Sequence, residues 1–134
     1  MKFANIVLLG ASALLMLGCS SSPKDAVEGM FDAMSNGNIE KLQKYATEST
    51  AQLLMLGVAA KCKENPKKFS DKNDYFEKCM EDRFSKLSVE DIKILNQTDT
   101  KASVEVTENI NGRKAKERLN VVKVNGDWKV SIAK

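Results

Sequence analysis

The spacing of apolar residues changes along the chain and divides it into three parts. Residues 6–17 form an almost unbroken apolar run. Between residues 23 and 87 apolar residues recur three or four positions apart, which predicts helices. From residue 88 onward they alternate with polar residues, the period of half-buried strands. Helices followed by strands predict an α+β domain, in which N-terminal helices pack on one face of a curved four-stranded antiparallel sheet.

Three or four helices are expected. Ser22 suits the N-cap of the first, Pro23 suits its first position, and Asn36-Gly37 suits its end. Asn38 caps a second, short helix, whose shared face carries Ile39, Leu42 and Tyr45. A third helix is apolar on nearly all sides between Leu53 and Ala60, so we expect it to be buried on more than one side. A fourth begins near Asp71, with one face formed by Phe76, Cys79, Met80, Phe84 and Leu87.

The strand half is divided by turn signals. Asn111-Gly112 and Asn125-Gly126 predict tight hairpin turns, because both central residues of a type I′ turn need a positive φ. The apolar faces of the four expected strands contain Ile92 and Ile94; Ala102, Val104 and Val106; Leu119 and Val121; and Trp128, Val130 and Ile132.

The N-terminal segment predicts where the protein is located in the cell. Lys2 precedes the apolar run, which is too short to cross a bilayer that needs about 20 apolar residues. The run ends at Gly18-Cys19, an arrangement that resembles the bacterial lipobox. We therefore expect a signal peptide at residues 1–18, a lipidated tether at 19–22 and a single domain at 23–134. The alternative is that Cys19 is an incidental cysteine after a conventional cleavage site.

The lipobox resemblance implies a diacylglyceryl group and an amide-linked acyl chain on Cys19. In the sorting rule that goes with it, aspartate after the cysteine favours the inner membrane. Ser20 stands there, so the resemblance implies an outer-membrane lipoprotein facing the periplasm.

The composition narrows the ligands and reactions that are expected for the protein. The chain has 21 basic and 18 acidic residues with the two signs interspersed, which is no nucleic-acid footprint. It contains no histidine, the commonest general base and metal ligand. No segment is expected to place a carboxylate on an apolar stripe. We therefore expect no metal, no cofactor and no catalysis.

Cys62 and Cys79 follow an export signal, and in an oxidising compartment a disulfide is the simplest interpretation. A redox or metal pair is the alternative, although neither Cys-x-x-Cys spacing nor histidine supports it. Five lysines cluster near this pair, at Lys61, Lys63, Lys67, Lys68 and Lys72. They indicate either a solvated loop or contact with anionic lipid headgroups.

Two segments carry a resemblance to a known fold. Residues 22–42, from Ser-Pro-Lys-Asp to Glu-Lys-Leu, resemble the opening of nuclear transport factor two-like domains, also called cystatin-like. Residues 122–132, with Asn-Gly-Asp-Trp at their centre, resemble the closing hairpin of these domains. The chain is specifically similar to small bacterial lipoproteins of an uncharacterised family with this fold.

The resemblance implies a cone formed by a curved sheet and its helices, with a mouth that can hold a ligand. Candidates for lining that pocket are Met30, Met34, Tyr45 and Trp128, with the core as the alternative place for the tryptophan. Asp32 and Glu40 are expected on the surface, with the inside of the cone as the alternative place for them and for Tyr45. The outer sheet face carries basic residues at one end and Val122 and Val124 at the other, which is compatible with a homodimer contact.

Two functions remain open at this stage. The first is a membrane-anchored lipoprotein that binds an envelope protein, a lipid or a small ligand without catalysis. The second is a pocket enzyme, such as an isomerase or hydrolase, that uses carboxylate and tyrosine groups.

Overall fold

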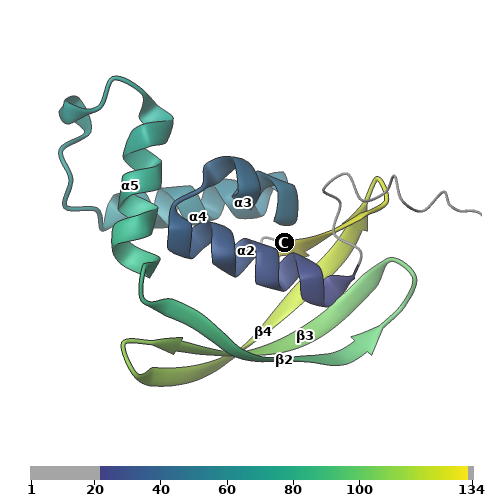
Figure 1. The fold of residues 1–134 in the computed structure, drawn as a ribbon. Coiled ribbons are helices and arrows are strands. Elements are labelled where there is room, and N and C mark those ends of the chain that lie inside the picture. The colour runs from purple at the N-terminus through teal and green to yellow at the C-terminus, as the bar shows by residue number, and fades with distance from the viewer. Residues whose placement is uncertain (1–21, 133–134) are drawn as a thin grey trace, which may run out of the picture.

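The computed structural model describes residues 22–132 as a layer of helices packed on one twisted antiparallel sheet (Figure 1). The helices are α2 (Pro23–Asn36), α3 (Ile39–Tyr45), α4 (Glu48–Ala60), the short 3₁₀ helix η1 (Pro66–Lys68) and α5 (Lys72–Phe84). The strands are β2 (Leu87–Gln97), β3 (Lys101–Ile110), β4 (Arg113–Val124) and β5 (Asp127–Ser131). The predicted α+β class is confirmed. The leader and Cys19 lie outside the described residues.

Local side-chain chemistry fixes where the first two helices begin and end. The Ser22 hydroxyl accepts a hydrogen bond from the Asp25 amide at 3.1 Å, and the Asn38 side chain accepts one from the Lys41 amide at 2.9 Å. Gly37 ends α2 with a φ of 64°, in the left-handed region that favours glycine. These three boundaries confirm the ones that the sequence predicts.

The sheet is a simple meander with strand order β2-β3-β4-β5, and every neighbouring pair is antiparallel. Asn111 and Asn125 have φ values of 56° and 51°, and the glycine after each is also positive, which confirms both predicted turns. Residues paired across strands share a face, so Val104 opposite Leu119 and Val121 opposite Val130 define the face that the helices cover.

The core lies between that face and α2. The buried side chains from the helices include Val27, Met30, Phe31, Leu42 and Met80, and those from the sheet include Val104, Val106, Val121, Trp128 and Val130. Gly29 lets Tyr45 of α3 pack directly on α2, because a Cβ atom there would lie 2.5 Å from the tyrosine ring. The core therefore fills the space under the helices.

The prediction that the third helix is buried on more than one side is wrong. In α4 the side chains of Leu53 and Leu56 are 52% and 64% exposed, and the buried residues are Thr50, Ala51 and Val58. The helix packs against α5 and makes smaller contacts with α3 and β5. Those neighbours cover one side of α4, and its leucine side remains open to solvent.

The fourth helix is shorter than expected. It ends at Phe84, where the Ser85 amide donates to the Glu81 carbonyl, and Leu87 instead begins β2. Leu87 pairs with Ile110 across the sheet and is buried there. The spacing predicted that Leu87 is on a buried face but assigned it to the fourth helix. One apolar residue near the end of a helix fits both the helical spacing and the strand spacing.

The Cys62 and Cys79 sulfur atoms lie at disulfide distance, with Cα atoms 5.4 Å apart. The pair joins the end of α4 to the buried face of α5. Residues 63–71 form the excursion between them, and this lysine-rich segment projects from one end of the helical layer (Figure 1).

Candidate functional site

The helix-covered face of the sheet continues beyond the helices. Along β3 the residues on this face are Ala102, Val104 and Val106, all buried, followed by the partly buried Glu108 and Ile110. Along β4 they are Val121 and Leu119, both buried, followed by Glu117, Ala115 and Arg113, all exposed. The same two strands therefore carry the core at one end and an uncovered surface at the hairpin end. We call this second part the open end of the sheet.

Glu108 and Glu117 form a carboxyl pair on the open end. Glu117 is paired with Val106 and Glu108 with Ala115, so the two acidic residues are diagonal neighbours on one face. Burial raises the pKa of Glu108 from its ordinary value of 4.5 to about 7, and a hydrogen bond with Glu117 and the negative charge of Glu117 add to the shift.

The raised pKa of Glu108 keeps a proton on the pair up to about pH 7. The Glu108 Oε2 atom is buried, and no hydrogen-bond donor among the described residues reaches it. Two carboxylates cannot hydrogen-bond to each other, so the contact with Glu117 requires a proton on one of them. Because the two groups are coupled, that proton belongs to the pair.

The surroundings of the pair are mixed in charge. A depression of about 340 Å³ at the hairpin is lined by Glu108, Ile110, Asn111, Arg113, Lys114 and Ala115. On the opposite sheet face, Glu90 accepts hydrogen bonds from Asn109 at 2.7 Å and from Lys114 at 3.1 Å. The Asn109 bond, followed by that of Lys114, lowers the pKa of Glu90. Acidic and basic groups thus meet at both faces of the hairpin.

The residues that the resemblance proposed for the pocket are buried or partly buried. Met30, Met34 and Trp128 are 3%, 6% and 4% exposed and belong to the core. Tyr45 is partly buried against Gly29. None of these four lines the depressions around Glu108, Glu28 or Asn96, and their place in a ligand pocket stays a prediction.

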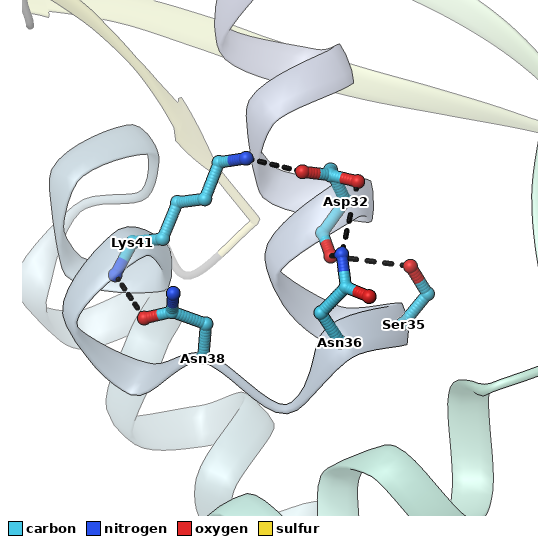
Figure 2. Close-up of polar contacts among 5 residues, drawn as sticks. All are labelled: Asp32, Ser35, Asn36, Asn38 and Lys41. Atoms are coloured by element: carbon cyan, nitrogen blue, oxygen red, sulfur yellow. Dashed lines mark hydrogen bonds and ion pairs between the residues drawn. The ribbon is translucent and has the colours of Figure 1, made fainter.

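Asp32 lies on the outer surface of α2, as expected, and takes part in a local polar cluster (Figure 2). It forms an ion pair with Lys41 of α3 and accepts a hydrogen bond from the Asn36 side chain at 3.1 Å. Its backbone carbonyl also accepts from the Ser35 hydroxyl at 3.1 Å. These contacts tie α2 to α3 around the Gly37 turn, and Glu40 is exposed nearby.

The surface has two further depressions among the described residues. One of about 260 Å³ lies between α2 and the start of β2 and includes Glu28, Asp32 and Val89. Another of about 470 Å³ crosses the far end of the sheet and includes Asn96, Ser103, Asn120 and Ser131. The open end of the sheet differs from both because it holds the carboxyl pair of Glu108 and Glu117, and it is the strongest candidate site.

The sequence contained a signal for this site that was missed. The expectation that no carboxylate lies on an apolar stripe is wrong, because Glu108 continues the series Ala102, Val104, Val106 at a spacing of two. Glu117 likewise precedes Leu119 and Val121. Extending the strand period by one more step would have found both residues.

No metal site is evident in the part of the chain that the structure describes, since residues 22–132 hold no suitable group of three or more His, Cys, Asp or Glu side chains. Within the same range no helix combines the length and apolarity needed to cross a membrane.

The architecture places the domain in the NTF2-like class. A solved structure from Campylobacter jejuni, provisionally described as an NTF2-like transpeptidase, superimposes with a TM-score of 0.50 at 14% sequence identity. The match covers 84% of this chain and 100% of the Campylobacter chain, and at this identity it establishes the fold alone. A comparison with curated proteins found no relative.

The chain belongs to the family described as Domain of unknown function (DUF4878), whose model matches residues 17–131.

Proposed function

We propose that this protein is a lipid-anchored lipoprotein of the bacterial envelope, and that its domain binds a partner at the open end of the sheet without catalysing a reaction. The anchor rests on the leader, in which an apolar run ends at Gly18-Cys19. Acylation of Cys19, with Ser20 next to it, gives an outer-membrane protein that faces the periplasm. Two or three acyl chains hold a protein stably on a membrane, whereas one does so only marginally.

The observation that carries the binding proposal is the contrast between the two ends of one sheet face. Under the helices, Met30, Met34, Trp128 and their neighbours are buried in the core. At the hairpin the same face is uncovered and combines the apolar Ile110 with the carboxyl pair. A shallow, solvent-accessible surface of this kind suits a partner segment better than an enclosed reaction.

The chemistry of the pair indicates the kind of group that it would hold. A lysine, an arginine or another cationic group placed between Glu108 and Glu117 replaces the shared proton and relieves the repulsion between the two charges. Ile110 offers an apolar contact beside it. We therefore infer that the ligand is a basic, partly apolar segment of an envelope protein or a small ligand of the same character.

Site-specific photocrosslinking in intact cells tests this function. Benzoylphenylalanine in place of Ala115 faces the open end, and the same residue in place of Lys116 on the opposite sheet face is the matched control. Capture of a defined partner should be several-fold stronger at position 115, and the double change Glu108→Gln with Glu117→Gln should reduce it. Asp32→Ala and Glu40→Ala should leave it unaltered. Equal capture at positions 115 and 116 would contradict the proposal.

One observation favours the enzymatic alternative. A carboxyl group whose pKa is about 7 has the value that suits a general acid or base near neutral pH. In that function Glu108 would transfer a proton to or from a substrate at the hairpin depression. Turnover of a defined compound that is lost in Glu108→Gln, while binding of that compound persists, would favour catalysis over binding.

A further inference from the structure

The outer side of α4 is an uncharged stripe on the surface of the domain. From Ser49 to Ala60 the helix contains no charged residue, and its exposed positions include Leu53, Leu56 and Gly57. The two leucines are the most exposed of the large hydrophobic side chains of residues 22–132. Solvent-facing leucines one turn apart on an uncharged stretch of helix indicate contact with an apolar phase or a partner.

Lysines stand where this stripe ends. Lys61, Lys63, Lys67 and Lys68 are all exposed, and they follow α4 directly in the excursion that Cys62 and Cys79 hold against α5. Glu64 is partly buried and the exposed Asp71 stands at the far end of the excursion, so the exposed charges that directly follow α4, up to Lys68, are positive. An apolar helix face bordered by lysines matches the boundary between acyl chains and anionic headgroups.

A second copy of the chain fits this surface less well. Two leucines and the small residues beside them cover far less than the roughly 1,200 Å² that a stable protein interface buries. Insertion into a lipid surface has no such minimum area when the protein is already held at the membrane. The lysines are also attracted to the negative charge of an anionic bilayer, whereas an apolar protein patch has no negative charge to attract them.

We propose that the α4 stripe, together with the lysines that follow it, lies on the anionic lipid surface and orients the domain there. This inference rests on the proposed anchor, because the residues between Cys19 and α2 can span only roughly 10 Å when extended. The start of α2 and the lysine-rich excursion lie at opposite ends of the helical layer (Figure 1). Contact along α4 therefore lays the helical layer along the membrane and turns the sheet away from it.

Photocrosslinking to lipid tests the orientation. The full chain, purified from membranes, is reconstituted into vesicles of phosphatidylcholine with or without phosphatidylglycerol. It carries benzoylphenylalanine in place of Leu56, or in place of Val124 as a control that is 37% exposed on the sheet. Lipid adducts at position 56 should exceed those at position 124 several-fold, and phosphatidylglycerol should increase them. The double change Lys67→Gln with Lys68→Gln should reduce the adducts at position 56.

Several outcomes would overturn the orientation. These are equal lipid adducts at positions 56 and 124, adducts indifferent to phosphatidylglycerol and to the lysine changes, and a crosslinked dimer in place of lipid at position 56. Flotation of a Cys19→Ser chain with vesicles tests the anchor separately. A wild-type chain that carries no lipid on Cys19 but gives the expected adducts would refute the anchor alone. A lipidated chain that gives no adducts at position 56 would refute the orientation alone.

Discussion

The carboxyl pair makes the stability of the domain depend on pH near neutrality. The folded protein keeps the Glu108 proton up to about pH 7, whereas the unfolded chain loses it near the ordinary pKa of 4.5. Between these values the folded state binds more protons, so the free energy of unfolding decreases as the pH rises. Below pH 4.5 both states are protonated and the full stability is retained.

Glu108→Gln removes this titration and keeps the shape of the side chain. The displacement of the Glu108 pKa corresponds to at most about 3 kcal/mol. Water reaches the exposed Glu117 and screens the repulsion, so we expect an effect of about 1 kcal/mol. The difference in unfolding free energy between the variant and the wild type should therefore rise by about 1 kcal/mol from below pH 4.5 to above pH 7.

Urea denaturation at a series of pH values measures this difference. Glu105→Gln is the matched control, because Glu105 lies on the opposite face of β3, across from Arg118. It should show no comparable rise. Glu117→Gln should lower the pKa of Glu108 but leave it above 4.5, since burial is the largest cause of the shift.

Two basic residues line the depression together with Glu108. Arg113 and Lys114 line the same depression and could stabilise an ionised Glu108. If either did so, Glu108→Gln would lose stability relative to the wild type as the pH rises. That result would show that the pair does not hold a proton at neutral pH.

Three further predictions concern stability and targeting. Gly37→Ala should destabilise the domain by roughly 1–3 kcal/mol in urea denaturation, because the left-handed φ is strained for alanine and its Cβ would lie 2.5 Å from the Glu77 carbonyl oxygen; an unchanged midpoint would contradict this. Changing both Cys62 and Cys79 to serine should cost roughly 2–5 kcal/mol, provided that thiol counting on the unreduced wild type finds them bonded. Cys19→Ser should leave an unprocessed or mislocalised form in cell fractions, and mature, aqueous wild type with a free N-terminus would refute lipidation.

The fold could be predicted largely because its boundaries are set by local chemistry. Ser22, Asn38 and Gly37 act on backbone groups within a few residues of themselves, so their effect is visible in the sequence. The two Asn-Gly turns are local in the same sense. Antiparallel strands joined by such turns then pair with their neighbours in order, which gives the meander.

The site was harder to predict because it depends on how far the helices extend over the sheet face. Periodicity identifies the side chains that share a face, but it does not say how far the neighbouring element extends over that face. Glu108 shares its face with Val106, yet one residue is partly open and the other is fully buried. The same limit explains α4, where an apolar composition indicated burial and the number of packing neighbours decided otherwise.

The division of β3 and β4 into a packed part and an uncovered part has a consequence for how the domain can change. Val104 and Leu119 contribute to folding, whereas Ile110 and Arg113 beyond them do not belong to the buried core. Substitutions or insertions near Asn111-Gly112 therefore change the open end of the sheet while the helices keep their support. If the open end binds a partner as proposed, relatives that differ mainly at this hairpin are expected to recognise different partners on the same scaffold.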